Sequence, residues 1–559
     1  MSLVMGIDTG GTFTDTVIWD TEAKKVLSKS KAFTTHDDLT LGINTCLDEL
    51  DLSHKNQIQA VHLSTTLAVN NILENKTHKL GLILLGRHIH KKLPVHGKYE
   101  IIKYQYNEKK NSFMFDANVK QDVCKKFGMG FPIIMISSAD GIKYPQAEKA
   151  AAESLANLID SQIICCSDIS EKNDFYERTL HATTTIGLRD IVTDWGACIM
   201  ETLKEYSIDV PVKILTGTGD LISLGEATIS PLKTIMSGPA ASFIGSTCLT
   251  DETDYLLLDM GGTSVDITKV EKRSTRSAPN KRTIGKYDYN IETLDLQSFG
   301  TGGDSIIRLN GLGDIVVGPD KVIPLCIIGS RAPHLNDELK QYLLEEDYDL
   351  LTADETDCYF ANREKPLLGL TKEEIRIVKL LMDKPHSLFF LADYFDKDAD
   401  ALHMDRVLEK GNVIKASLTP TDILHAEGVF TRWNTTIAQT GVKIISIRKH
   451  YKSQQLIKEV KRIITKQLVF SCMQSIAGFE QKSFSFNESA ATMYLIDKFL
   501  DQNDGLLSSR FAISKPIIGV GAPARAWLPP VAEKLGSSLI LPEDGDVACA
   551  IGAAAGRVL

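Results

Sequence analysis

The sequence has no apolar run long enough to form a membrane helix. Every such run falls short of the ~20 residues that span a bilayer. The opening residues Met1–Asp8 also lack the cationic start and the long apolar core of a secretion signal. We therefore expect a cytoplasmic protein that does not insert into a membrane.

Positive charge is in short supply. The 62 lysines and arginines are outnumbered by 72 aspartates and glutamates, which gives a formal net charge of -10 at pH 7. A nucleic-acid-binding surface needs a concentrated basic patch that neutralises phosphates. This charge balance argues against a nucleic acid as a partner.

Paired cysteines are missing. The ten cysteines are scattered without the spacing of a zinc framework or a disulfide scaffold. Cys165 and Cys166 are adjacent, but they lie in an apolar run that favours a buried strand end over a redox pair. In a reducing compartment the cysteines are expected to be free thiols.

Two common catalytic motifs are absent as well. Neither the Walker motif G-x-x-x-x-G-K-[ST] nor the G-x-S-x-G elbow occurs, so the sequence argues against a P-loop enzyme. What remains has the composition of an ordinary globular protein, with 43% apolar and 24% charged residues. A chain of 559 residues exceeds what one hydrophobic core organises, so two or more domains are expected.

A short acidic and glycine-rich pattern occurs twice. Asp8–Asp15 reads DTGGTFTD and Asp259–Asp266 reads DMGGTSVD, with Asp, Gly, Gly, Thr and Asp at the same spacing. Each copy follows an apolar run and leads into β-branched residues, which predicts a strand, a tight turn and a second strand. The two copies are much further apart than the ~20 to 50 residues of a solenoid unit. The repeat therefore predicts two related α/β domains whose hairpins face each other.

The rest of the chain suggests where these domains lie. We expect a first domain at residues 1–190 and a second at residues 191–559, with a polar, helix-rich insertion at about residues 340–420. Residues 454–470 carry apolar side chains at helical spacing and predict an amphipathic helix. Residues 271–289 are charged and contain a proline and a glycine, which predicts an exposed loop.

The repeated pattern has a specific chemical use. Glycines in a tight turn let backbone N–H groups approach an anion closely, and the threonine hydroxyls add donors. The flanking carboxylates would repel a phosphate, but a hard divalent cation resolves the conflict, because Mg²⁺ is held by one or two carboxylates together with phosphate oxygens. One copy alone could be an ordinary hairpin turn with an aspartate cap. Two copies at the same spacing favour a nucleoside triphosphate with Mg²⁺, gripped between the hairpins.

This interpretation assigns roles to individual residues. Asp8 and Asp259 are the candidate catalytic residues, because they would orient the water shell of the metal ion, and Asp266 is a third candidate metal ligand. The phosphates would contact the turn residues Gly10, Gly11, Thr12, Gly261, Gly262 and Thr263.

Paired hairpins of this kind resemble the two phosphate-binding motifs of the acetate kinase, sugar kinase, heat-shock chaperone and actin superfamily. Within that superfamily the chain resembles the hydantoinase/oxoprolinase A family in five ordered stretches. They are MGIDTGGTFTD (Met5–Asp15), STTLAVNNILE (Ser64–Glu74), SGPAASFIGS (Ser237–Ser246), LDMGGTSVDI (Leu258–Ile267) and FGTGGDSI (Phe299–Ile306). The resemblance implies an α/β fold of duplicated RNase H-like domains, as in actin-like ATPases, with a nucleotide cleft between them.

The resemblance also implies an activity. ATP with Mg²⁺ would phosphorylate the carbonyl oxygen of a small cyclic amide, imide or ketone, which turns a poor electrophile into one with a leaving group. Ring-opening hydrolysis of the cyclic amide or imide would then require a separate hydantoinase B-type subunit, and a homo-oligomer is compatible with the sequence. Two other functions stay open: an ATPase switch that reactivates or assembles a partner protein, and a small-molecule kinase that releases a stable product.

Two further glycine-rich turns are implied to contact adenosine. They contribute the residues Gly302, Gly303, Ser305, Gly519, Gly521 and Ala522. The second turn, in PIIGVGAPARAW, also imitates the fingerprint of a dinucleotide-binding fold. Too few residues follow Glu543 to complete a doubly wound sheet, so we favour the adenosine contact. The small-residue stretch Ala548–Gly556 predicts a closely packed helix.

The chain departs from the family pattern in several places, and two of these departures are single residues. Ser64 stands where a glycine usually precedes the two threonines, and Arg525 stands at the place of a histidine near the end of the chain. The hairpin motifs are kept while these flanking positions differ. We therefore expect the ATP grip to be retained and the substrate side to be altered.

Overall fold

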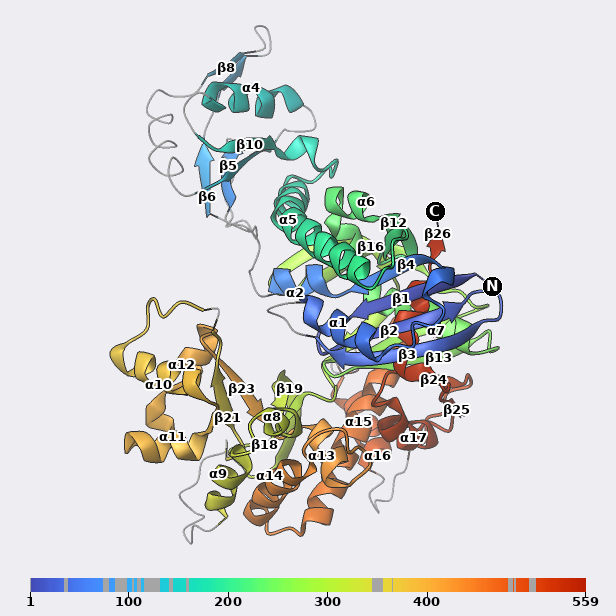
Figure 1. The fold of residues 1–559 in the computed structure, drawn as a ribbon, viewed down its shortest axis with the longest axis vertical. Helices are drawn as coiled ribbons and strands as arrows, with labels where there is room; N and C mark the ends of the chain where they lie inside the picture. Colours follow the sequence, from blue (N-terminus) through green and yellow to red (C-terminus); the bar gives the residue numbers. More distant parts are fainter. Residues whose placement is uncertain are drawn as a thin grey trace. The chain divides into compact units, whose positions relative to one another are not determined.

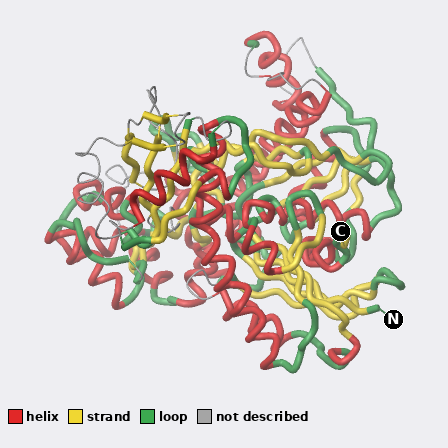
Figure 2. Tube along the Cα trace, turned by 90° about the horizontal axis from the view of Figure 1, so that it is seen from above, coloured by secondary structure: helices red, strands yellow, loops and turns green. Residues whose placement is uncertain are grey.

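The computed structural model describes residues 2–34, 39–73, 80–85, 98–102, 105–107, 112–114, 131–139, 144–156, 160–343, 355–363, 365–480, 486, 489–501 and 509–558. Helices and strands follow one another throughout these residues, so the fold is mixed α/β (Figures 1 and 2).

The chain forms two compact units. Unit 1 combines residues 1–248, 275–295 and 547–559, and unit 2 combines residues 249–274 and 296–546. The boundary expected at residue 190 falls inside α5, a continuous helix from Phe175 to Glu205. Both units are therefore assembled from segments that are distant in the sequence, which a division into two consecutive domains does not describe.

The elements of unit 1 have the following bounds: β1 Leu3–Thr9, β2 Phe13–Asp20, β3 Lys25–Phe33, α1 Leu39–Glu49, β4 Ile58–Thr65, α2 Leu67–Leu73, β5 Leu80–Leu85, β6 Lys98–Ile102, β7 Gln105–Asn107, β8 Ser112–Met114, β9 Ile133–Ser138, α4 Pro145–Ala156, β10 Gln162–Cys165, β11 Val212–Leu215, β12 Asp220–Ser223, α6 Leu224–Ile229, α7 Ser237–Leu249, β15 Ser277–Ile284, β16 Tyr287–Leu294, α18 Ala548–Ala554 and β26 Arg557–Val558.

The elements of unit 2 have the following bounds: β13 Tyr255–Met260, β14 Val265–Val270, β17 Leu296–Phe299, β18 Ser305–Leu309, β19 Ile315–Lys321, β20 Ile323–Pro324, α8 Leu325–Arg331, α9 Leu335–Tyr342, β21 Cys358–Ala361, α10 Lys372–Asp383, β22 His386–Ser387, α11 Leu388–Phe395, α12 Met404–Glu409, β23 Val413–Ser417, α13 Pro420–Ala426, α14 Thr435–Arg448, α15 Ser453–Glu480, α16 Ala490–Asp501, β24 Ile517–Val520, α17 Ala524–Lys534 and β25 Leu539–Ile540.

The main sheets of the two units have the same topology. In unit 1, β3, β2, β1, β4 and β11 are neighbours in that order, and in unit 2 the order is β17, β14, β13, β24 and β25. In both sheets the first three strands are antiparallel and the last two run parallel to the central strand. This is the strand order of an RNase H-like fold, so the predicted duplication is confirmed.

Helices cover both faces of the main sheet in unit 1. Side chains alternate along β1, so Met5 and Ile7 point into a cluster with α1 and α5, whereas Gly6 faces α18. Figure 1 shows this C-terminal helix in red beside the blue N-terminal strands. A Cβ added at Gly6 would overlap the carbonyl oxygen of Ala550. The small-residue helix is therefore a closely packed element, as predicted.

The prediction of an exposed loop at residues 271–289 is wrong for most of that range. Residues from Ser277 onward form the antiparallel hairpin of β15 and β16, and Ile284, Tyr287 and Tyr289 are buried in the core of unit 1. Gly285, at φ +60°, supplies the tight turn between the strands. The charged residues and the proline concealed an alternation of apolar side chains, which is the pattern of a half-buried strand.

The long helices follow the predicted periodicity. In α15, the buried apolar side chains Leu456, Val460, Ile464 and Leu468 repeat every four residues and pack into the core of unit 2. Helices α10, α11 and α12 and strands β21, β22 and β23 lie in the region of the expected insertion at about residues 340–420, of which residues 344–354 and 364 lie outside the described part.

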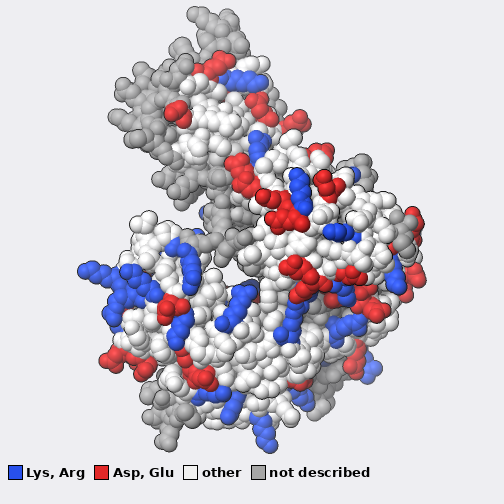
Figure 3. Space-filling model, in the orientation of Figure 1, with Lys and Arg blue, Asp and Glu red and all other residues white. Residues whose placement is uncertain are grey.

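Among the helices that the structure describes, none combines the length and apolarity needed to cross a bilayer. The described cysteines are free thiols. Figure 3 shows basic and acidic side chains interspersed over most of one face, with a small basic group near α10 and α12.

Candidate functional site

The first hairpin turn is held in a defined conformation but remains open at its tip. Asp8 pairs with Asp15 across β1 and β2, and the Gly10 N–H donates to the Phe13 carbonyl oxygen at 2.9 Å. A Cβ added at Gly11 would meet no atom within 4 Å. The turn therefore leaves space at Gly11 for a ligand to approach the backbone.

The two carboxylates of the first hairpin have different partners. The Lys31 ammonium, on the adjacent strand β3, lies 2.6 Å and 2.7 Å from the two oxygens of Asp15. Asp8 is buried with 8% of its surface exposed, and its Oδ1 accepts a hydrogen bond from the Ser64 hydroxyl. Ser64 reaches Asp8 because β1 and β4 are parallel neighbours in this register. The departure from the family pattern at Ser64 therefore contacts the candidate catalytic residue directly.

Two other family-like stretches converge on this hairpin in unit 1. The Thr66 N–H donates to the Thr9 carbonyl oxygen at 3.1 Å. Ser237, the first residue of α7, accepts from the Thr65 N–H at 3.1 Å and donates to the Thr65 carbonyl oxygen at 2.9 Å. Three separate sequence motifs thus form one hydrogen-bonded cluster around the β1–β2 turn.

The second hairpin repeats the first. Asp259 pairs with Asp266 across β13 and β14, and the Gly261 N–H donates to the Ser264 carbonyl oxygen at 2.9 Å. Asp259 also lies beside Val520 of β24, in the register that places Ser64 beside Asp8. The backbone arrangement is the same in both units, but only Asp8 has a hydroxyl at this position. The two hairpins are similar in geometry and differ in the environment of the first carboxylate.

The loop between β17 and β18 packs directly on the second turn. The Gly303 N–H donates to the Gly261 carbonyl oxygen at 3.3 Å, and the Asp304 N–H donates to that of Gly262 at 2.6 Å. A Cβ added at Gly302 would overlap the Gly262 carbonyl oxygen. Only a glycine allows this approach of the two backbones. The structure therefore brings this loop and the second hairpin together.

The turn after β24 approaches Asp259 from the neighbouring strand. Gly521 has φ +89°, and a Cβ there would overlap the Met260 carbonyl oxygen and lie 3.1 Å from Oδ1 of Asp259. Gly519 lies within β24, where a Cβ would press on Leu528. Of the residues expected to contact adenosine, Gly521 borders the hairpin and Gly519 is part of the strand–helix packing. The sheet around β24 contains antiparallel strands, unlike a doubly wound dinucleotide fold.

Two polar residues that contact the loop between β17 and β18 were not predicted from the sequence. Lys321, at the end of β19, donates from Nζ to Oγ of Ser305 at 2.7 Å and to the Gly300 carbonyl oxygen. Burial lowers the pKa of Lys321 to about 8, although the nearby Asp304 carboxylate acts in the opposite direction. Thr421 donates from both its backbone N–H and its hydroxyl to the Gly303 carbonyl oxygen. Both residues fix the loop that packs on the second hairpin.

Arg525, at the position of the expected histidine, lies on α17. Its Nη2 donates to the Pro542 carbonyl oxygen at 2.9 Å. This hydrogen bond ties the start of α17 to the segment after β25. Arg525 therefore has a hydrogen-bond partner within unit 2.

Two family models match the parts of the chain that contain both hairpins and the loop from Gly302 to Ser305. The model of the hydantoinase/oxoprolinase N-terminal region matches residues 4–159, and the hydantoinase/oxoprolinase model matches residues 178–323. The two matches together span more than half of the 559 residues.

Two curated proteins are similar to the chain. The acetophenone carboxylase gamma subunit of Aromatoleum aromaticum is 24% identical over 384 residues, which cover 59% of this chain and 52% of that protein. The caprolactamase subunit alpha of Pseudomonas jessenii is 23% identical over 360 residues, which cover 56% of this chain and 50% of that protein. The chain spans about half the length of these curated relatives.

Two solved structures share the fold. A nucleotide-free structure of acetone carboxylase matches with a TM-score of 0.64 and 16% identity. The match covers 99% of this chain and 70% of the acetone carboxylase chain. The structure of the ATP-dependent caprolactamase from Pseudomonas jessenii matches with a TM-score of 0.56 and 17% identity. The match covers 98% of this chain and 70% of the caprolactamase chain. The ordered motifs, the duplicated sheets and the two family matches agree, and the chain belongs to the hydantoinase/oxoprolinase family.

Proposed function

We propose that the chain is an ATP-dependent subunit that activates the carbonyl group of a small cyclic amide or imide for ring-opening hydrolysis. The observation that carries the proposal is the pair of matching acidic hairpins, one in each RNase H-like unit. Similarity to a caprolactamase subunit supports a cyclic amide as the substrate class. The names of both relatives denote subunits, which supports a separate partner subunit, and we propose one of the hydantoinase B type.

The residues present fit Mg-ATP. The open side of the turn at Gly11 would admit a phosphate group to the backbone amides, and the hydroxyl of Thr12 would add a donor. Gly10 would contact the phosphates from the same turn. Asp8 would hold the metal ion in part through water, which suits a cation that keeps several of its waters.

The second hairpin would also contribute to binding of Mg-ATP. Gly261, Gly262 and Thr263 would contact the phosphates, and Asp259 and Asp266 would hold the metal ion. The loop from Gly302 to Ser305, together with Gly519, Gly521 and Ala522, is proposed as the adenosine side; its support is the packing of the loop and of Gly521 against this hairpin.

ATP, when bound, supplies a phosphoryl group that converts the carbonyl oxygen into part of a leaving group. The chain's own task is to position the nucleotide and the acceptor and to offset negative charge, because phosphoryl transfer depends mainly on positioning and electrostatics. The buried carboxylate of Asp8, fixed by Ser64, would contribute by holding the metal ion that offsets the charge of the phosphates.

A ketone is the second candidate for the acceptor. It is favoured by similarity to an acetophenone carboxylase subunit and by the shared fold with acetone carboxylase. A ketone has the same carbonyl oxygen to phosphorylate but no ring amide to open. The products therefore separate the two candidates.

Phosphate release with a panel of acceptors tests the proposal. Lactams, cyclic imides and ketones would each be added to the purified chain with Mg-ATP, with and without a candidate partner subunit. We expect one class to stimulate phosphate release about tenfold or more. Stimulation by a protein alone would instead indicate an ATPase switch, and a stable phosphorylated product in the mass spectrum would indicate a kinase.

Replacing Ser64 with alanine is expected to lower ATP turnover about tenfold, or about 1.4 kcal/mol in activation free energy. The variant removes the hydroxyl that donates to Asp8 and leaves its buried carboxylate less well fixed. The measurement is kcat for Mg-ATP hydrolysis. Ser30→Ala is the matched control, because it removes a buried serine hydroxyl that donates to the Cys46 carbonyl oxygen instead. Equal activity of the two variants would show that Ser64 does not position Asp8.

A further inference from the structure

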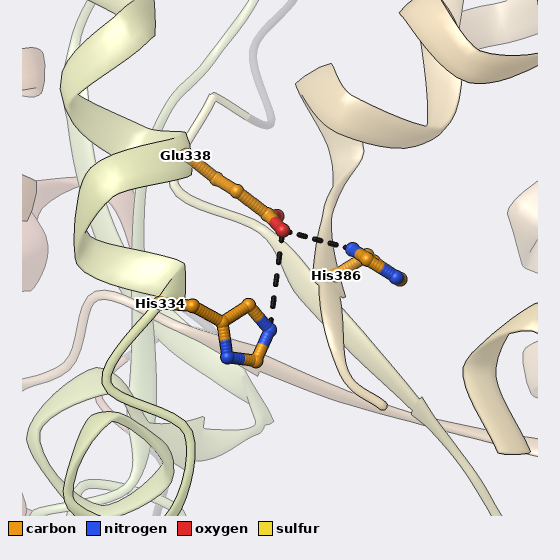
Figure 4. A group of neighbouring side chains, drawn as sticks. All are labelled: His334, Glu338 and His386. Atoms are coloured by element: carbon orange, nitrogen blue, oxygen red, sulfur yellow. Dashed lines mark hydrogen bonds and ion pairs between the residues drawn. The ribbon is translucent and has the colours of Figure 1, made fainter. Parts of the chain in front are cut away.

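Three side chains of unit 2 that lie outside both hairpin motifs come close together in space. His334 precedes α9, Glu338 lies one helical turn later, and His386 lies on β22. Figure 4 shows nitrogen atoms of both imidazoles directed toward one oxygen of the carboxylate. Oε1 of Glu338 is 2.8 Å from Nδ1 of His386 and 3.9 Å from Nε2 of His334. The three candidate ligand atoms all lie within 4.8 Å of one another.

The surrounding backbone fixes this arrangement. The Ser387 N–H donates to Oε2 of Glu338 at 2.8 Å, which leaves Oε1 facing the two imidazoles. β22 is paired with β21, with Tyr359 opposite His386, and the imidazole of His386 stacks on Phe390 with 4.0 Å between ring centroids. A sheet, a backbone amide and a stacked ring therefore hold the two inner donors, His386 and Glu338, in place.

Burial differs among the three residues in a way that suits a metal site. The side chain of His386 is 1% exposed and that of Glu338 is 11% exposed, whereas that of His334 is 34% exposed. The two inner ligands are shielded from water, and His334 provides the route by which an ion would enter. The same opening would leave one coordination position for a water molecule.

The donor atoms indicate which class of ion would bind. Two imidazole nitrogens and one carboxylate oxygen are a ligand set found at zinc sites. In such sites three protein side chains bind Zn²⁺ and a water molecule is the fourth ligand. Mg²⁺ and Ca²⁺ prefer oxygen donors and would not select two imidazoles. We propose that His334, Glu338 and His386 form a binding site for a divalent cation of the zinc type.

Binding would exchange hydrogen bonds for coordination bonds. Nδ1 of His386 would bind the ion in place of its hydrogen bond to Glu338. The proton on Nδ1 would move to the other ring nitrogen or be released to solvent. Nε2 of His334, now 2.8 Å from the Pro385 carbonyl oxygen, would give up that hydrogen bond. The alternative role of the three residues is a hydrogen-bonded contact between α9 and β22 that holds no ion.

Zinc binding to the full chain distinguishes these two roles. Protein freed of metal by a chelator, without nucleotide, would be titrated with Zn²⁺ by calorimetry and with Co²⁺ by visible absorption. We expect one ion bound per chain, with the absorption bands of four-coordinate Co²⁺ and a higher thermal midpoint in the presence of Zn²⁺.

Variants locate the ion at the proposed site. His334→Ala and Glu338→Gln should each weaken Zn²⁺ binding about tenfold or more. Asp337→Asn is the matched control, because this carboxylate is the neighbour of Glu338 on α9 but is 80% exposed and paired with Lys340. Circular dichroism of each variant verifies folding. Wild-type affinity in both folded site variants, or no uptake of Zn²⁺ by the wild-type chain, would overturn the proposal.

Discussion

Asp8→Asn is expected to reduce the turnover of Mg-ATP by about 100-fold or more while leaving the fold intact. Asparagine has nearly the same shape as aspartate and still offers an oxygen to the Ser64 hydroxyl. It lacks the negative charge that the proposed metal site requires. The measurement is the steady-state rate of phosphate release, together with the thermal midpoint as a test of folding.

The control for this variant is Asp20→Asn. Asp20 is also buried on the first hairpin, but it lies at the far end of β2, where its carboxylate accepts from the N–H groups of Glu22 and Ala23. This variant should retain turnover, because it changes a structural carboxylate remote from the turn. If Asp8→Asn turned over ATP as fast as Asp20→Asn, Asp8 would have no part in the reaction.

Gly552→Ala is expected to reduce the free energy of unfolding by about 3 kcal/mol or more. Within a helix this change normally stabilises by up to about 1 kcal/mol. Here the added Cβ would overlap the Ala241 carbonyl oxygen of α7, and backbone atoms cannot move aside as a flexible side chain can. The overlap outweighs the gain in helix propensity, so the net effect is destabilising. Denaturant unfolding followed by circular dichroism measures it.

Gly311→Ala provides the comparison for this effect. A Cβ at Gly311 would meet no atom within 4 Å, so its stability should match that of the wild type. Gly245→Ala should resemble Gly552→Ala, because its Cβ would overlap the Ala548 carbonyl oxygen at the same helix pair. Unchanged stability in both helix variants would contradict the close packing of α7 on α18.

The sequence predicted best those features that are encoded locally. The hairpins follow from a short pattern of apolar residues, glycines and β-branched residues, and the structure has a β-hairpin at each copy. The amphipathic pattern of residues 454–470 likewise identified the buried face of α15. The sequence misled where charged residues hid an alternating pattern, as in the hairpin of β15 and β16.

Features that depend on long-range contacts could not be predicted. Ser64 was noted as a departure from the family pattern, but its contact with Asp8 depends on the register of two parallel strands. Lys321 and Thr421 fix the glycine-rich loop from distant positions in the chain, and nothing in their local sequence indicates this. The pair His334 and Glu338 has helical spacing, but His386 joins it only through the pairing of β22 with β21.

The division of the chain into two units also depends on long-range contacts. Residues after Val547 complete unit 1, where α18 packs on β1 and β26 pairs with β12. No local pattern assigns the end of a chain to the sheet at its beginning. Two consecutive domains were therefore the simplest expectation from a repeated hairpin, and the segments that return to unit 1 were missed.

Calorimetric titration of Mg-ATP into two glycine variants tests most directly the proposal that the acidic hairpins bind Mg-ATP. A Cβ at Gly11 meets no atom within 4 Å and one at Gly261 meets only ordinary contacts, so Gly11→Ala and Gly261→Ala should fold normally and obstruct only a bound phosphate. We expect one Mg-ATP per wild-type chain, binding about tenfold weaker or worse in each variant, and no change in Gly311→Ala. Wild-type affinity in either hairpin variant would contradict the claim.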